Sequence, residues 1–299
     1  MDATGHASQP RIKTRFLILS DTHGMDIPTE YIDQPDIDVA IHCGDLTAEL
    51  HEYHSAIQLL QTIHAPLKLV IAGNHDISLD EPCFRQKVAD ARSLDIDPRQ
   101  IRAEFGDYGQ ARALFDETAG ISFLDEGTHR FALANGASLT SQGHEFAIPN
   151  SSVDVVLTHG PPRGILDIAS SGSRTGCHCL FEAIAWSRPR LHCFGHIHEA
   201  WGAKLVTWRK TLSETPNHFA DIDHGKSSVV ATLATMAWAQ ADQDVHDAGS
   251  FCCHTSHCAG DPNPLRRGLQ TLFVNAAVEG LGEVPIQLPW LVDIELDPV

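Results

Sequence analysis

The sequence has little positive charge. Lysine and arginine together number 21 among 299 residues, against 39 aspartates and glutamates, so the formal net charge is −18. Surfaces that bind a bare phosphate backbone carry clustered lysine and arginine, so this deficit argues against a nucleic-acid-binding protein. It does not exclude a phosphorylated substrate, because bound cations can reverse the local field.

A long apolar run and a regular cysteine framework are also missing. No stretch approaches the ~20 apolar residues that span a bilayer, and the polar residues 1–13 lack the apolar core of a signal peptide. The eight cysteines are unevenly spaced, and a chain of this length needs no disulfides, so we expect reduced thiols. These absences favour a cytoplasmic protein with a flexible tail at residues 1–13 and no membrane contact.

Short apolar runs alternate with helical patterns over the first two hundred residues. The apolar runs are 16–19, 39–41, 67–72, 153–157 and 191–194. Helical patterns occupy 51–63, 81–94, 98–105, 110–118 and 177–186. This alternation predicts an α/β architecture with largely buried sheets.

The pattern is looser after residue 208. Residues 210–225 are polar, and residues 240–264 are rich in Asp, Cys, His, Gly and Pro, with little periodicity. We expect both to be long loops or an irregular insertion. Apolar runs return at 229–233, 272–274 and 290–294, and these are expected to close the sheets.

Each early apolar run is followed by residues able to bind a metal ion. These residues are Asp21, His23, Asp45, Asn74, His159, His196 and His198. In open α/β sheets, the ligand site lies beyond the carboxyl ends of the strands. Five such ends placed side by side would gather these side chains into one cluster.

The donor types in this predicted cluster indicate which metals it would hold. Carboxylate and amide oxygens mixed with imidazoles suit Mn, Fe or Zn better than Ca or Mg. Seven positions exceed what one ion uses, so we expect two ions that share a carboxylate. Two metals ~3.5–4 Å apart stabilise an in-line displacement at phosphorus. Gly44, Gly73 and Gly195 are expected to leave room for the ions and a phosphate.

Several other residues remain open to two interpretations. The Cys/His-rich residues 252–258 could bind zinc, but they lack paired Cys-x-x-Cys spacing, which favours a plain loop. Cys177 and Cys179 fit a helix start better than a metal site. His42 and His192 lie on predicted strands beside the cluster and are equally compatible with a supporting role and with plain core packing.

Taken in order, the strand-end segments resemble the calcineurin-like metallophosphoesterases, whose blocks are Asp-x-His, Gly-Asp, Gly-Asn-His-[Asp/Glu], His and Gly-His-x-His. Residues 157–166, 192–199 and 272–277 are similar to the class III cyclic-nucleotide phosphodiesterase branch and its metallophosphoesterase-domain-containing relatives. The resemblance covers most of 15–294. It implies an α/β fold of two packed mixed β-sheets flanked by helices, and a single domain over residues 14–299.

The resemblance also implies roles for individual residues. One metal ion would be held by Asp21, His23, Asp45 and His198. The other would be held by Asp45, Asn74, His159 and His196. A hydroxide between the ions would be the nucleophile. His75 would donate a proton to the leaving alkoxide or steady the developing charge, and Asn74 and His75 would contact the substrate. Arg163, which flanks the fourth block, is open to two interpretations, a contact with the substrate charge or a solvated surface arginine.

Two departures from the family pattern affect the expected substrate. Residues 44–49 lack the arginine that grips phosphate in phosphoprotein phosphatases, and residues 137–146 are shorter than in the closer branch. We expect a hydrolase of small phosphodiesters such as cyclic nucleotides. A phosphomonoesterase and a metal-binding scaffold with lost activity are the alternatives. We expect no sequence-specific nucleic-acid partner, and a homodimer stays open.

Overall fold

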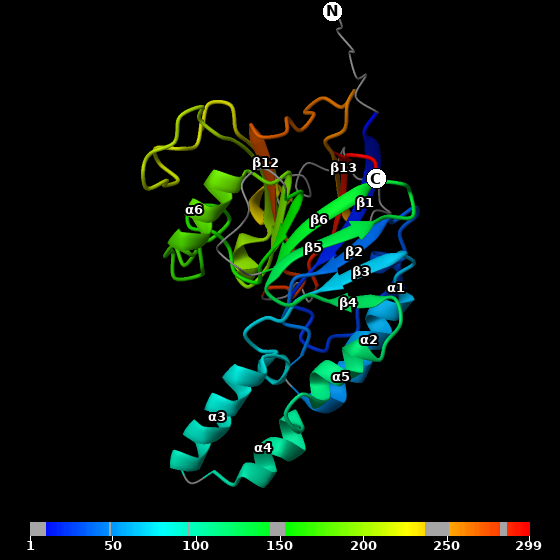
Figure 1. Ribbon diagram of the computed structural model, residues 1–299. Helices are drawn as coiled ribbons and strands as arrows, with labels where there is room; N and C mark the ends of the chain where they lie inside the picture. The colour runs from blue at the N-terminus through cyan, green and yellow to red at the C-terminus, as the bar shows by residue number, and fades with distance from the viewer. Residues whose placement is uncertain (1–9, 48, 95, 144–152, 237–250, 282–285) are drawn as a thin grey trace, which may run out of the picture.

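Two mixed β-sheets form the centre of the computed structural model, which describes residues 10–47, 49–94, 96–143, 153–236, 251–281 and 286–299 (Figure 1). Among these residues the first sheet has six strands. In spatial order they are β11 (Cys253–Ser256), β13 (Trp290–Leu296), β1 (Ile12–Leu19), β2 (Val39–His42), β3 (Leu67–Val70) and β4 (Ile121–Phe123). The strands β1 to β4 run parallel, whereas β13 is antiparallel to β1.

The second sheet has seven strands in the described part of the chain. In spatial order they are β10 (Ser228–Thr232), β9 (Gly202–Thr207), β12 (Gln270–Asn275), β8 (Leu191–Phe194), β7 (Val155–Leu157), β6 (Ser138–Gly143) and β5 (Gly127–Ala132). In this order, neighbouring strands from β12 to β6 are parallel, and the pairs β10–β9, β9–β12 and β6–β5 are antiparallel. The predicted fold class is therefore confirmed.

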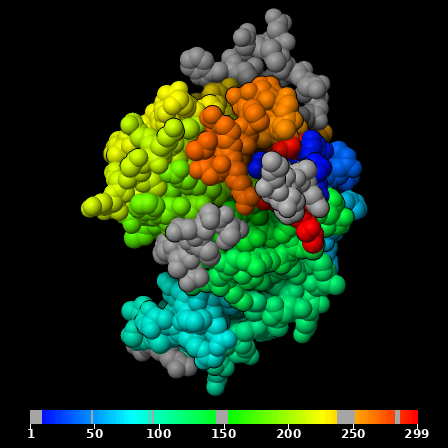
Figure 2. Space-filling model, turned by 45° about the horizontal axis from the view of Figure 1, so that its top comes forward, coloured from blue at the N-terminus to red at the C-terminus, as the bar shows by residue number. Residues whose placement is uncertain are grey.

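Six helices are described, and several of them cover the outer faces of the sheets. They are α1 (Thr29–Ile32), α2 (Tyr53–Thr62), α3 (Glu81–Ser93), α4 (Pro98–Phe105), α5 (Gln110–Asp116) and α6 (His178–Ser187). Tyr53 of α2 and Phe115 of α5 pack against the first sheet, and Phe181 of α6 packs against the second. The helices α3 and α4 extend away from the sheets, and Figure 2 shows them in cyan at the end opposite the yellow loops near residue 210.

Alternate residues of β1 serve two different cores. Phe16 and Ile18 face the core between the sheets, whereas Leu17 and Leu19 face the helices on the other side. A strand covered on both faces reads as a continuous apolar run, which is why this strand was predictable from sequence. Between the sheets, Trp201 stacks on Trp290 of β13 with ring centroids 4.9 Å apart.

Three predictions about the less regular segments can be compared with the structure. The irregular insertion predicted for 240–264 is wrong at Cys253–Ser256, because this segment forms β11, the edge strand that pairs with β13. Residues 240–250 lie outside the described residues. The predicted tail ends earlier than expected, since β1 already pairs with β13 at Ile12. Of the segment 137–146, residues 138–143 form β6, and residues 144–146 lie outside the described residues.

Two further observations concern the cysteines and the helices. All eight cysteines lie in the described residues and are free thiols. None of the helices in the described ranges combines the length and the apolar character that crossing a bilayer requires.

Candidate metal centre

Loops from both sheets meet at the carboxyl ends of the parallel strands. The Asp21 N–H donates to the Gly44 carbonyl at 2.9 Å, which joins the loops after β1 and β2. In the other sheet, the Gly195 N–H donates to the His159 carbonyl at 2.9 Å. The His196 N–H then reaches across to the Asp21 carboxylate at 3.0 Å, so the loops of the two sheets are connected.

The loops bring the predicted ligands together in two groups. Asp21, His23 and His198 form the first group, and Asp45, His159 and His196 form the second, with potential ligand atoms within 4.8 Å of one another in each. Asn74 joins the second group, because its Oδ1 lies 2.9 Å from His159 Nε2. The structure therefore brings together every residue that the sequence predicts as a metal ligand.

Asp45 lies between the two groups. Its Oδ2 is 3.2 Å from His159 Nε2 and 3.8 Å from His23 Nε2. Its Oδ1 accepts a hydrogen bond from the His75 backbone N–H at 2.8 Å. A carboxylate that faces a histidine of each group has the position that a ligand shared by two ions requires.

The backbone of these loops is held in an unusual conformation. Asp21, His23, Asp45 and His196 have φ angles of 57°, 43°, 55° and 68°. Among the described residues, seven non-glycine residues have positive φ, and these are four of them. Left-handed backbone at non-glycine residues is uncommon and concentrates at functional sites. The surrounding hydrogen bonds must offset this strain in order to aim the four side chains inward.

Glycines make room for the carboxylates of the site. A Cβ atom on Gly195 would lie 2.0 Å from Asp21 Oδ2, and one on Gly73 would lie 2.2 Å from Asp45 Oδ1. One on Gly44, whose φ is +92°, would lie 2.5 Å from the Gly73 nitrogen. The expectation that these glycines leave room for ions and phosphate is therefore corrected, because the space at each is taken by the protein itself.

Both aspartates favour the ionised form. Burial raises the pKa of Asp45, but the hydrogen bond and charge of His159, with the His75 N–H, outweigh it and lower the pKa to about 2. Burial likewise raises the pKa of Asp21, and the hydrogen bond from His198 is the largest of the effects that outweigh it and lower that pKa. Two ionised carboxylates in a buried site favour a bound cation.

The four histidines divide into two kinds. Burial lowers the pKa of His159, but the Asp45 carboxylate outweighs it and raises that pKa overall, and the hydrogen bond to Asp21 raises the pKa of His198. Burial lowers the pKa of His23 and His196. Metals bind neutral imidazole, so protons compete with a metal more strongly at His159 and His198 than at His23 and His196.

His42 and His192 support the loops. The Gly44 N–H donates to His42 Nδ1 at 3.3 Å, so the His42 proton is assigned to Nε2, which donates to Thr22 Oγ1 at 3.0 Å. His192 Nε2 is similarly 2.9 Å from Thr158 Oγ1, next to His159. The Thr22 hydroxyl donates onward to the Leu46 carbonyl in the loop after β2, and the Thr158 hydroxyl donates to the Gly160 carbonyl of its own loop. Of the two interpretations left open, the geometry favours support for the loops.

The sequence assigns no role to two further carboxylates of the site. Asp76 is fully buried and accepts hydrogen bonds from the N–H groups of Gly73, Leu46 and Thr47. Burial raises the pKa of Asp76 to about 7. Its position at the end of the Gly-Asn-His-Asp block is the sequence feature that could have identified Asp76. Glu279 contacts His23 and His198, and nothing in its local sequence distinguishes it.

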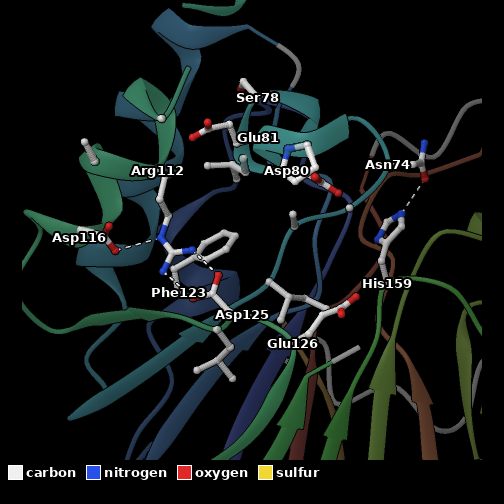
Figure 3. Close-up of a pocket in the computed structure, with 18 of the residues that line it drawn as sticks. Asn74, Ser78, Asp80, Glu81, Arg112, Asp116, Phe123, Asp125, Glu126 and His159 are labelled. Atoms are coloured by element: carbon white, nitrogen blue, oxygen red, sulfur yellow. Dashed lines mark hydrogen bonds and ion pairs between the residues drawn. The ribbon is translucent and has the colours of Figure 1, made fainter. Parts of the chain in front are cut away.

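An acidic cavity of about 1010 Å³ opens beside the second group (Figure 3). Asn74, His159 and His196 line one end of it. Its lining also includes the carboxylates of Asp80, Glu81, Asp116, Asp125 and Glu126. Arg112, the one lysine or arginine among the described lining residues, is engaged by Asp116 and Asp125. The wall next to the second group is therefore negatively charged.

The remaining predicted residues lie outside this cavity lining. His75 is exposed, and its ring meets the His23 ring edge-on at 5.0 Å. Arg163 is exposed, with its guanidinium 3.5 Å from the Arg174 carbonyl. Substrate contacts of both residues stay predictions. In the segment 252–258, His254 pairs with Asp293 and His257 with the Asn263 carbonyl, and among the described residues no group there could hold an ion.

The residues present fit a pair of transition-metal ions. Each group offers at least one carboxylate and two imidazoles, a donor set that suits Mn, Fe or Zn. Gly195 and Gly73 have no Cβ atom, so the carboxylates of Asp21 and Asp45 can lie directly against the backbone of these loops. The number and identity of the ions stay predictions.

Comparison with known proteins gives an independent finding. Residues 14–200 match the family described as calcineurin-like phosphoesterase. The human and mouse metallophosphoesterase domain-containing protein 1 are each 31% identical to this chain, over 66% of this chain and 64% of theirs. A UPF0046 protein of Caenorhabditis elegans is 28% identical over 67% of this chain and 55% of its own. The chain thus aligns with less than two thirds of the length of these relatives.

Proposed function

Since this chain belongs to the calcineurin-like phosphoesterase family, we propose that it is a two-metal hydrolase of small phosphodiesters. The observation that carries the proposal is the position of Asp45 between two donor groups, 3.2 Å from His159 and 3.8 Å from His23. Asp21, His23, Asp45 and His198 would hold one ion, and Asp45, Asn74, His159 and His196 the other. Bound there, two ions would neutralise phosphate charge and lower the pKa of a water molecule.

His75 would assist the leaving group. Its backbone N–H holds Asp45, and its exposed ring lies against His23 at the edge of the centre. From this position the ring can meet the bridging oxygen of a substrate without giving up a metal ligand. A proton supplied to the departing alkoxide matters most for a basic alcohol, because such an alkoxide is a poor leaving group.

The charge of the cavity supports a diester rather than a monoester. A phosphodiester carries one negative charge, whereas a phosphomonoester at neutral pH carries nearly two. The cavity beside Asn74 and His159 is lined by carboxylates, and Arg112 is already held by Asp116 and Asp125. No arginine follows Asp45 in residues 46–49 either. A second phosphate charge would therefore meet repulsion and no free guanidinium in the described lining.

The test is a comparison of matched aryl substrates. Metal-stripped protein is supplied with Mn²⁺ and assayed with bis(4-nitrophenyl) phosphate, 4-nitrophenyl phosphate and a set of cyclic nucleotides. We expect a higher kcat/KM for the diester than for the monoester, and no turnover by Asp45→Ala. A higher kcat/KM for the monoester would support a phosphomonoesterase. Two tightly bound ions without turnover of any substrate would support a metal-binding scaffold.

A further inference from the structure

Hydrogen bonds to main-chain carbonyls connect the segment around Glu279 to two loops of the metal centre. The preceding residue, Val278, donates its N–H to the Ser20 carbonyl at 2.9 Å, directly before Asp21. The buried Gln287 side chain donates to the carbonyls of both Glu279 and His198, at 2.9 and 3.2 Å. The backbone of Glu279 is therefore fixed relative to the first group of ligands, and 42% of its side chain is exposed.

The Glu279 carboxylate faces two candidate ligands of the same ion. Its Oε2 lies 3.2 Å from His23 Nε2 and 3.4 Å from His198 Nδ1. The other ring nitrogen of His198, Nε2, lies 3.4 Å from Asp21 Oδ1. His198 thus has a carboxylate at each ring nitrogen. In metal sites, a carboxylate on the outer nitrogen of a histidine fixes its tautomer and ring orientation, and it leaves the other nitrogen free for the ion.

Glu279 makes the two halves of the centre unequal in charge. The first group has the carboxylate of Asp21 and the nearby carboxylate of Glu279, and it is also faced by the Asp45 carboxylate. The second group has Asp45 and the uncharged amide of Asn74. At such short distances an additional negative charge attracts a cation appreciably, even when the effective dielectric constant is high.

We propose that Glu279 is a positioning residue of the metal centre, which holds His198 through Nδ1 and adds negative charge beside His23. The ion at Asp21, His23 and His198 is then bound more tightly than the ion at the second group. This inference rests on the proposed two-metal function. It concerns a residue that lies outside the predicted ligand set.

The test is a metal titration of the whole chain. Metal-stripped wild type and Glu279→Gln are titrated with Co²⁺, with heat and the visible Co²⁺ spectrum as readouts. We expect two binding events in the wild type. In Glu279→Gln, the tighter event should weaken about 10–100-fold, the range typical of partners that orient a metal-bound histidine. The weaker event should stay, and the Co²⁺ bands of the tighter event should shift.

A matched control distinguishes the loss of the Glu279 contacts from the loss of one negative charge near the site. Glu199 is adjacent to His198 in sequence, and Glu199→Gln removes the same charge without removing the carboxylate that faces His23 and His198. Both binding events should be retained in this variant. Wild-type affinities at both events in Glu279→Gln, or equal loss of both, would overturn the role of Glu279 and leave the two-metal function intact. A wild type that binds no ion would contradict the proposed function and this inference together.

Discussion

Asp45 is the residue on which both halves of the candidate metal centre depend. Its carboxylate faces His159 and His23, its backbone is left-handed at φ 55°, and its pKa is lowered to about 2. The His75 N–H donates to its Oδ1, so the neighbouring candidate acid is tied to it through the main chain. At this scale the side chains of Asp45 and His75 have separate roles and can be tested separately.

Replacing His75 by alanine should slow the reaction in proportion to the basicity of the leaving group. An alkyl phosphodiester should lose about 10²–10⁴-fold in kcat, the usual contribution of general acid catalysis. A 4-nitrophenyl diester should lose far less, because nitrophenolate departs without a proton. Steady-state kinetics of the two substrates measure the difference.

The number of bound metal ions is the control for the His75 variant. It should stay at the wild-type value, because the backbone N–H of His75 that donates to Asp45 is kept in the alanine variant. Near-full turnover of the alkyl diester by His75→Ala would contradict the proposed role.

The loops after the strands position the ligands through close backbone approach. The loop after β8 brings Gly195 against the Asp21 carboxylate, and the loop after β3 brings Gly73 against Asp45. His42, the last residue of β2, and His192, within β8, hold the threonines beside Asp21 and His159. The site is therefore a property of how the loops of two sheets fit together.

Gly195→Ala should destabilise the protein and weaken metal binding. The added Cβ atom would lie 2.0 Å from Asp21 Oδ2, so the loop or the carboxylate must move. We expect a loss of about 1–3 kcal/mol in the free energy of unfolding, which is typical of overpacking. Urea denaturation of the metal-stripped protein measures the loss, and a Co²⁺ titration measures the weakened binding.

Gly225→Ala is the matched control for this variant. Its Cβ atom would meet Asp223 Oδ1 at an ordinary 3.6 Å, far from the predicted ligands in sequence. The substitution should leave stability and metal binding near their wild-type values. Equal behaviour of the two alanine variants would refute the argument from close approach.

The elements that the sequence predicts well are those with strong apolar periodicity or clear caps. The predicted run 191–194 is β8, and the pattern 98–105 is α4, which Asp97 caps and Gly106 ends. Strand β5 was missed because polar and charged residues interrupt its few apolar ones. Strand β11 was missed because it has no aliphatic residue. Such strands are stabilised by their partners in the sheet, which local sequence does not show.

The same distinction holds within the site. All seven predicted ligands follow strands in recognisable blocks, and the structure gathers them. Glu279 reaches the centre only because Val278 and Gln287 fix it against loops that are distant in sequence. A contact of this kind depends on tertiary structure, so no motif could reveal it.

On the scale of the whole molecule, each sheet contains a buried histidine beside the metal centre. Burial lowers the pKa of His42 in β2 to about 4 and that of His192 in β8 to about 3. Both are fully buried, and His192 Nδ1 has no hydrogen-bond partner among the described residues. Below pH ~6.5 the unfolded chain therefore binds a proton at each of these histidines, whereas in the folded protein both stay neutral until a lower pH.

This difference predicts acid-sensitive stability. Because the folded pKa values lie below the unfolded value, the stabilisation is complete above pH ~6.5 and is lost as the pH falls toward ~3. Where the unfolded chain is protonated at both histidines and the fold at neither, the two histidines contribute a slope of up to about 2.7 kcal/mol per pH unit. The raised pKa of Asp76 opposes them with a slope of up to about 1.4 kcal/mol per pH unit. Urea denaturation of the metal-stripped protein between pH 7 and 4 measures it.

A substitution isolates the contribution of His192. Glutamine does not titrate, and its amide can still donate to Thr158, so His192→Gln should reduce the slope by about 1.4 kcal/mol per pH unit in this window. An unchanged slope in the variant would show that His192 is not the titrating group.

The central claim is that two ions act together across Asp45. The most direct measurement adds Mn²⁺ stepwise to metal-stripped protein while the bound ions and the hydrolysis of bis(4-nitrophenyl) phosphate are followed together. The account predicts two ions per chain at saturation, hydrolysis that rises with the second ion, and loss of both hydrolysis and at least one ion in Asp45→Asn. Full hydrolysis with one ion per chain, or with none, would contradict it.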